Sequence, residues 1–361
     1  MNWIEQNWVK NTILSCSSIL VSLVIIELIL IVFNPSNLSQ SSNKPVYFSQ
    51  DSDYGRLGGA YGNMCEYGWC PNEGIYISKK LWGDEVIYDV KYTIDKARMR
   101  VTPFNSENPD NDMVINFFGG SHTFGEGLND NETLPYFVHK QTNYRTYNFG
   151  FHGYGIHNGL YRLPSLPRNN DLNEKVINVI LTSSAHGNRS SCELSFTDGH
   201  PKYEINKSRK QGEAFVLYRG KCNNKVRSFI SKVIYKLNLT KYSQLATLIL
   251  NYINSYKTSK EKKISLYKAI ILEFNRISIS RGEKLIVMYQ ASPPPSDNNI
   301  PISLNEKIIE FLKENNISVF NAGLNRNRKY YIHERDRHPS ALANKEKAKM
   351  LVSYLKSNFD N

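Results

Sequence analysis

The sequence predicts an α/β fold in which helices cover both faces of a mostly parallel, five-stranded sheet. Short apolar runs recur along the chain, and each is typical of a buried strand. They occupy residues 113–118, 145–149, 176–182, 284–290 and 317–321. The stretches between them have helical patterns, and such alternation favours a parallel sheet. The chain of 361 residues is long enough to bury a large core around it.

The N-terminal end predicts a single membrane anchor. An apolar run of about 22 residues extends from 12 to 33 and stops at Asn34-Pro35, and this length can cross a bilayer once. A short segment, residues 1–11, precedes it, and no small-x-small cleavage site follows it. We therefore expect an uncleaved anchor rather than a removed signal peptide.

Glu27 is the single charged residue in this run. Its carboxylate could reach toward the headgroups, be protonated, or pair with a partner membrane protein. We favour the first alternative, because Glu27 would lie roughly 9 Å from the outer end of the run.

A linker and a small lobe separate the anchor from the α/β domain. Residues 34–46 are rich in Ser, Asn and Pro, which is typical of a linker. Within residues 47–108, the segments 75–77 and 86–94 alternate apolar and polar residues and predict strands with one exposed face. The α/β domain is then expected over residues 109–361.

The cysteines indicate an oxidising compartment. Cys16 lies in the apolar run, and the remaining four form an even set that permits two disulfides. The pairing that we consider first is Cys65–Cys70 with Cys192–Cys222, and the sequence leaves the other pairings open. Zinc binding is the competing interpretation, but the spacings do not fit paired Cys-x-x-Cys knuckles. Together with the anchor, this places the main body outside the cytoplasm, in the periplasm if the cell is bacterial.

A candidate nucleophile follows the first strand of the α/β domain. The segment Gly119-Gly120-Ser121 joins strand 113–118 to a helical pattern at 133–141. A serine on a glycine-rich turn between a strand and a helix is where α/β hydrolases expose their nucleophile. Taken alone, the segment fits a plain strand–helix connection equally well.

A candidate base and acid stand just before the last helix. His338 is followed by Pro339 and a helical pattern to about residue 359, and Asp336 lies two residues before it. Ser121, His338 and Asp336 then form a Ser–His–Asp triad. Glu334 is the competing acid, but its longer side chain is costlier to fix. The similar segment 198–201, Asp-Gly-His-Pro, is mid-chain, and we interpret it as a turn in a hairpin.

These segments together resemble the SGNH/GDSL hydrolase family over roughly residues 110 to 359. The first family block resembles 119–121, the second 148–155 and the last 336–339, while 130–135 is similar to a bacterial, membrane-anchored branch. The resemblance implies a flavodoxin-like three-layer α/β/α sandwich. It also implies that backbone N–H groups of Ser121 and Gly153 form an oxyanion hole.

The sequence departs from the family in three places. Gly120 stands where the usual motif has Asp, and Arg335 stands where the family commonly has the acid. No Gly-x-Asn-Asp follows strand 176–182, so the usual Asn donor to the oxyanion hole is missing. His186 or Asn188 could donate instead, and Arg189 could hold an anionic substrate group; alternatively, these residues only cap a loop.

An insertion at about residues 190–260 carries much of the net charge of +12. From 202 to 263 there are fifteen Lys and Arg against three Glu. A helical face at 226–237 fits either a core-facing helix with a solvated basic back, which we favour, or contact with an anionic membrane or acidic glycan. No motif predicts nucleic-acid binding.

The sequence thus predicts a membrane-anchored serine hydrolase that acts on ester bonds of acylated glycans or lipids, without a cofactor or metal. Two alternatives remain open. The same triad could serve an O-acyltransferase, because the acyl-enzyme can be resolved by water or by a sugar hydroxyl. The missing Asn donor would also fit a catalytically idle, glycan-binding relative.

Overall fold

The computed structural model describes residues 46–49, 64–104, 113–167, 175–223, 259–291 and 304–359, with scattered positions in 12–27, 52–57 and 243–248. The chain divides into two compact units. One comprises residues 1–43 and 225–257, and the other comprises 44–224 and 258–361. The second unit contains the predicted sheet and every candidate catalytic residue.

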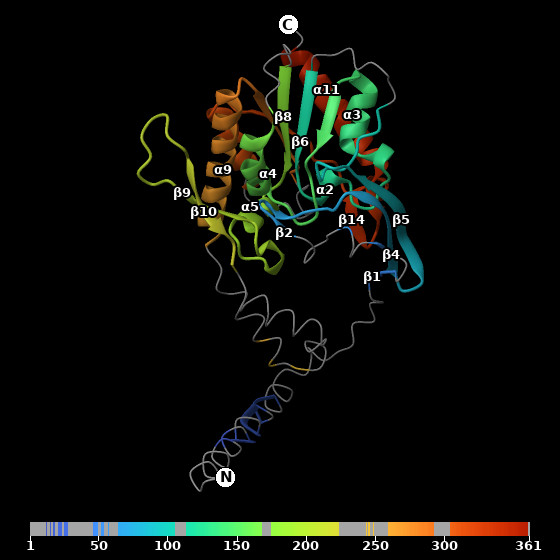
Figure 1. Ribbon diagram of the computed structural model, residues 1–361, viewed down its shortest axis with the longest axis vertical. Coiled ribbons are helices and arrows are strands. Elements are labelled where there is room, and N and C mark those ends of the chain that lie inside the picture. Colours follow the sequence, from blue (N-terminus) through green and yellow to red (C-terminus); the bar gives the residue numbers. More distant parts are fainter. Residues whose placement is uncertain are drawn as a thin grey trace. The chain divides into compact units, whose positions relative to one another are not determined.

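The central sheet has five parallel strands in the order β12-β11-β8-β6-β7 (Figure 1). Their bounds are β6 Met113–Gly119, β7 Arg145–Asn148, β8 Lys175–Thr182, β11 Lys284–Tyr289 and β12 Ser318–Asn321. All five predicted strands are therefore confirmed. Read along the chain, the order is that of flavodoxin-like sheets, in which ligands bind at the carboxyl ends of the strands where the order reverses. This switch point lies between β6 and β8, directly beyond Gly119.

Two hydrophobic clusters cover the two faces, because alternate residues of each strand point to opposite sides. On β6, Phe117 belongs to one cluster and Phe118 to the other, and both are fully buried. The first face packs against α3 (Leu134–Thr142) and α11 (Ala341–Phe359). The second packs against α4 (Ile156–Arg162), α9 (Lys260–Ser280) and α10 (Leu304–Glu314). The predicted three layers are thus present.

Polar residues start two of the long helices. Thr133 accepts a hydrogen bond from the backbone N–H of Tyr136 at the N-terminus of α3, where Pro135 occupies the first turn. Ser259 accepts from the backbone N–H of Lys262 and begins α9. Two short helices, α2 (Ser121–Phe124) and α5 (Ala185–Ser190), follow β6 and β8 at the switch point.

The lobe before the sheet is β-rich, as predicted. Strands β1 (Val46–Phe48), β4 (Gly74–Trp82) and β5 (Glu85–Ile94) form an antiparallel sheet, and β2 (Met64–Cys65) pairs with β3 (Gly68–Trp69). Its hydrophobic cluster combines lobe residues such as Tyr92 with Phe124, Phe151 and Tyr154 of the α/β domain. The lobe therefore packs directly against the turn that carries Ser121 and the loop that carries Gly153.

Both predicted disulfides are present. Cys65–Cys70 closes the β2–β3 hairpin, and Cys192–Cys222 joins the segment after α5 to the end of β10. The second bond thereby ties the start of the basic insertion to the end of its first hairpin.

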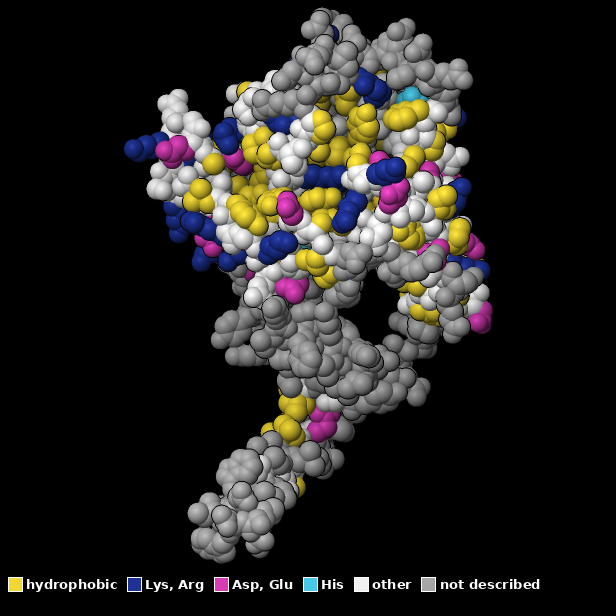
Figure 2. All heavy atoms as spheres, viewed as in Figure 1, with side chains coloured by type: hydrophobic (Ala, Val, Ile, Leu, Met, Phe, Trp, Pro, Cys, Tyr) yellow, Lys and Arg dark blue, Asp and Glu magenta, His cyan; other side chains and the backbone are white. Residues whose placement is uncertain are grey.

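The described part of the insertion is a hairpin of β9 (Pro201–Ile205) and β10 (Val216–Lys221). The segment 198–201 is a turn, as predicted, but it leads into β9 and is not the turn of the hairpin. Figure 2 shows basic and acidic side chains mixed on this hairpin. Lys202 and Arg219 both pair with the exposed Glu204. The predicted helical face at 226–237 lies outside the described residues.

The predicted anchor, residues 12–33, also lies largely outside the described residues. In the part of the chain that the structure describes, no helix combines the length and the apolar character needed to cross a membrane. Glu27 finds its hydrogen bonds within its own chain. Its Oε2 accepts from Ser243 Oγ at 3.0 Å and from the Leu245 backbone N–H at 2.9 Å.

Candidate active site

Ser121 is the first residue of α2 and directly follows the glycines that end β6. Gly119 has φ +158°, and a Cβ there would collide with Thr123 Oγ1 and the Leu181 carbonyl oxygen. A Cβ on Gly120 would collide with Arg189 Nη1 and the carbonyl oxygen of Tyr154. The two glycines thus allow a turn packed tightly between neighbouring loops. It leaves Ser121 only 7% exposed.

The three predicted triad residues lie in hydrogen-bonding order. His338 Nε2 is 2.9 Å from Ser121 Oγ, and His338 Nδ1 is 2.5 Å from Asp336 Oδ1. Asp336 and His338 both belong to β14 (Asp336–Pro339), which pairs with β13 (Tyr331–His333). Asp336 Oδ1 also accepts the backbone N–H of His338 at 3.1 Å, so the turn fixes both side chains. The competing acid, Glu334, is exposed, and its Oε1 lies 3.8 Å from Arg335 Nε.

Lys80 of β4 forms an ion pair with Asp336, the acid of the predicted triad. Its Nζ lies 2.7 Å from Asp336 Oδ2, the oxygen that faces away from His338. Burial alone would raise the pKa of Asp336, but the bonds with His338 and Lys80 outweigh it and hold this pKa well below its usual range. Asp336 is therefore a carboxylate at neutral pH and can fix the tautomer of His338.

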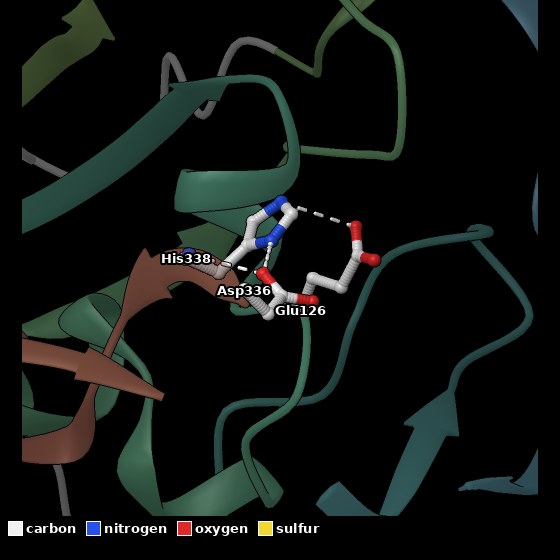
Figure 3. A group of neighbouring side chains, drawn as sticks. All are labelled: Glu126, Asp336 and His338. Atoms are coloured by element: carbon white, nitrogen blue, oxygen red, sulfur yellow. Dashed lines mark hydrogen bonds and ion pairs between the residues drawn. The ribbon is translucent and has the colours of Figure 1, made fainter. Parts of the chain in front are cut away.

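A second carboxylate, Glu126, lies on the other side of the imidazole (Figure 3). Its Oε2 is 3.3 Å from His338 Nε2 and 2.8 Å from His152 Nδ1, and its Oε1 is 3.7 Å from Lys80 Nζ. Burial favours the neutral acid, but His152 and then His338 lower the pKa of Glu126 to about 2. Burial lowers the pKa of His338, whereas Glu126 and Asp336 together raise it above its usual value.

Glu126, Asp336 and His338 could each direct one ligand atom to a common point, since these atoms lie within 4.8 Å of one another. Lys80 already ion-pairs with both carboxylates. The cluster is therefore explained as an ion-pair network around His338, without a metal ion.

The second sequence block lies beside the nucleophile turn. Asn148, at the end of β7, donates from Nδ2 to the Thr123 carbonyl at 2.9 Å and accepts the Gly150 N–H at 3.0 Å. This side chain links the block to α2. Gly153 adopts φ +73°, in the left-handed region that glycine favours.

The loop after β8 differs from its predicted role. The buried His186 has both ring nitrogens on protein partners, Nδ1 on Thr182 Oγ1 at 3.1 Å and Nε2 on Arg189 Nη1 at 3.4 Å. Because the guanidinium can only donate, Nε2 accepts and no ring N–H remains for an oxyanion. Asn188 is exposed. His186 therefore has no ring N–H to offer an oxyanion, whereas Asn188 stays a predicted donor. Arg189, in contrast, lies against Gly120.

A buried polar chain lies behind the histidine. His122 packs edge-on against His338 with ring centroids 5.4 Å apart, and its Nδ1 is 3.2 Å from Gln290 Oε1. Lys347 of α11 donates to the same oxygen at 2.6 Å. Burial, then the charges of His338 and Lys347, lower the pKa of His122 to about 3, and burial lowers that of Lys347 to about 8. His122 is therefore neutral and leaves His338 as the titrating imidazole.

Sequence reasoning missed Lys80 and Glu126. The sequence around Glu126 did indicate a turn, because the residue is flanked by Gly125 and Gly127. In the structure these glycines have φ values of +83° and +76° and form a tight turn. Lys80 had none, since it lies in another lobe and 256 residues before Asp336.

A cavity of about 740 Å³ opens at the opposite end of the sheet. Its lining includes Val114 and Arg145, at the start of β6 and β7, and Arg281. It contains none of the triad residues, which lie beyond the carboxyl ends of the strands.

A search of solved structures finds 34 matching chains. One is TesA, with a TM-score of 0.40 and 12% identity, covering 68% of this chain and 98% of that one. Another is a member of the lipolytic protein G-D-S-L family from Veillonella parvula, with a TM-score of 0.36 and 12% identity, covering 69% and 99%. A carbohydrate esterase matches with a TM-score of 0.39 and 13% identity, covering 88% and 99%.

The sequence itself matches no family model and no curated protein. The family that the motifs resemble is named among the structural matches. At these identities and TM-scores, the likeness assigns neither activity nor substrate. What the chain does is therefore inferred from its side-chain geometry.

Proposed function

We propose that the protein is a serine hydrolase of ester bonds, with Ser121 as nucleophile, His338 as base and Asp336 as the residue that orients it. The observation that supports this most directly is the chain of contacts from Ser121 Oγ through both ring nitrogens of His338 to Asp336, at 2.9 and 2.5 Å. Nucleophile, base and orienting acid are each within hydrogen-bonding distance of the next, as nucleophilic catalysis requires.

The reaction follows from these positions. Ser121 Oγ attacks the ester carbonyl carbon while His338 Nε2 takes the hydroxyl proton. The carbonyl oxygen becomes an oxyanion, which the backbone N–H groups of Ser121 and Gly153 would receive. The bond to the alcohol then breaks, and His338 returns the proton to the leaving oxygen. Water attacks the acyl-enzyme by the same proton route and releases the acid.

The proposed setting is outside the cytoplasm, with residues 12–33 as a single-pass anchor. Two disulfides in the unit that contains the five-stranded sheet support an oxidising compartment. An acylated glycan or lipid of the cell envelope is the substrate class that this setting favours. Transfer of the acyl group to a sugar hydroxyl would use the same acyl-enzyme. An intact Ser–His–Asp arrangement argues against a merely glycan-binding role.

Labelling with a fluorophosphonate probe tests the proposed nucleophile. The full chain in detergent should be labelled once, and peptide mass spectrometry should find the modification on Ser121. Ser121→Ala should abolish both labelling and the turnover of 4-nitrophenyl acetate. Ser183→Ala, a serine in the neighbouring loop after β8, is the matched control. Undiminished turnover by Ser121→Ala would overturn the proposal.

A further inference from the structure

The guanidinium of Arg189 lies between the two loops that would form the oxyanion hole. Its Nη1 donates at 2.6 Å to the carbonyl of Tyr154, the residue after Gly153. The same nitrogen occupies the space that a side chain on Gly120, the residue before Ser121, would need. One cation thus touches both the nucleophile turn and the loop of the second sequence block.

A buried chain of groups fixes this guanidinium from behind. His186 accepts from Nη1 and donates to Thr182 Oγ1, which lies 3.0 Å from the hydroxyl of Tyr267. Burial, followed by the charge of Arg189, lowers the pKa of His186 well below its usual value, so the imidazole stays neutral and keeps its acceptor on the arginine. Arg189 is thereby held in one orientation before any substrate arrives.

Donors on Arg189 remain available. A guanidinium has five N–H groups, and the bonds found among the described residues use only Nη1. The side chain is half-buried, so its charge is only partly screened by solvent. A fixed cation with unused donors beside a nucleophile is suited to stabilise negative charge that develops during the reaction.

We propose that Arg189 is a catalytic residue that donates to the oxyanion formed when Ser121 attacks the ester carbonyl. It joins the N–H groups of Ser121 and Gly153 and supplies the third donor, for which the sequence offers no Asn in the expected place. The proposal rests on the proposed hydrolase function and makes it more specific. It also explains Gly120, since a side chain there would displace the guanidinium.

The competing role for Arg189 is to hold an anionic group of the substrate. The two roles differ in what they require of the substrate. An oxyanion forms on every ester, whereas a charged substrate group is present only on some. A neutral ester and an anionic ester with the same leaving group therefore separate them.

The test compares Arg189→Ala and Arg189→Lys with wild type on 4-nitrophenyl acetate and 4-nitrophenyl hemisuccinate. Loss of an oxyanion donor should lower kcat on the order of 100- to 1,000-fold for both esters, with KM changed only a few-fold. Arg219→Ala, which removes an exposed arginine of the β9–β10 hairpin, is the matched control and should keep wild-type kinetics. Unchanged kcat on the acetate, with or without a raised KM on the hemisuccinate, would overturn the proposal.

Two further measurements separate catalysis from folding and from the parent proposal. Added methylguanidinium should partly restore the kcat of Arg189→Ala, because it can replace the missing donor. It would not restore kcat if the substitution had misfolded the site. Ser121→Ala is the second measurement, because it removes the proposed nucleophile and leaves Arg189 in place. If Ser121→Ala retains activity, the hydrolase assignment fails; if only the Arg189 variants retain it, the donor assignment fails alone.

Discussion

At the scale of single residues, His338 lies between the carboxylates of Asp336 and Glu126, which affect its two ring nitrogens differently. Asp336 on Nδ1 fixes the tautomer that the reaction needs. Glu126, 3.3 Å from Nε2, attracts the protonated imidazole on the side where Ser121 must donate its proton. Asp336, Glu126 and His122 lie against the ring, and Lys80 acts on it through its ion pairs with the two carboxylates.

Glu126→Gln should move the acid limb of the pH profile. The base must be neutral, so activity rises with pH as His338 loses its proton. Glu126 raises the pKa of His338, and removing its charge should therefore shift the acid limb of kcat/KM to lower pH. Glu334→Gln, an exposed acid near the same histidine in sequence, is the control. Identical acid limbs in wild type and Glu126→Gln would contradict this role.

Asp336→Asn should nearly abolish turnover. The amide keeps the shape but favours the wrong tautomer of His338, and kcat should fall by on the order of 10,000-fold with little change in KM. Glu334→Gln should remain within a few-fold of wild type. The opposite ranking of these two variants would reassign the acid and leave the Ser–His mechanism intact.

At the scale of elements, strand β4 contributes to a site that lies beyond the ends of other strands. Lys80 is largely buried and ion-pairs with Asp336 at 2.7 Å. The Nζ also lies 5.6 Å from the ring centroid of Phe48 and 5.7 Å from that of Tyr88. The lobe therefore adds, through Lys80, to the effect of His338 in lowering the pKa of Asp336.

Lys80→Met should destabilise the fold and slow turnover. It leaves a buried carboxylate without its cation, which typically costs about 3–5 kcal/mol. Lys79→Met is the matched control, because the neighbouring Lys79 pairs at 3.4 Å with the exposed Asp89, and exposed pairs contribute about 0–1 kcal/mol. Urea unfolding and kcat should be measured for both. Equal stability of the two variants would show that the Lys80 pair is not a structural element.

The elements that sequence could predict are those specified locally. Apolar runs predicted the five strands. The glycines after the first strand marked Ser121, and Pro339 before the last helix marked His338. The loop after β8 was harder, because the choice among His186, Asn188 and Arg189 depends on which side chains meet Thr182, Tyr154 and Gly120. Lys80 and Glu126 reach His338 and Asp336 only in the folded chain, so no local pattern reports them.

At the scale of the whole molecule, the disulfides connect structure to compartment. Cys65, Cys70, Cys192 and Cys222 are paired. If the proposed location is right, these thiols should resist a maleimide reagent in native protein isolated from cells and react after reduction. Mass spectrometry of the alkylated peptides measures this. Four modified thiols before reduction would contradict an oxidising compartment.

The hydrophobic cluster that the lobe shares with Phe124, Phe151 and Tyr154 limits how short an active fragment can be. Arg100, fully buried just after the lobe strands, donates to the carbonyls of Phe124, Gly125 and Leu128 immediately beyond Ser121. A fragment that begins at residue 109 would keep every triad residue but lose this support and the packing of Tyr92 on Phe124. The nucleophile turn therefore depends on residues outside the α/β domain for part of its support, so a change in the lobe should also alter the position of Ser121.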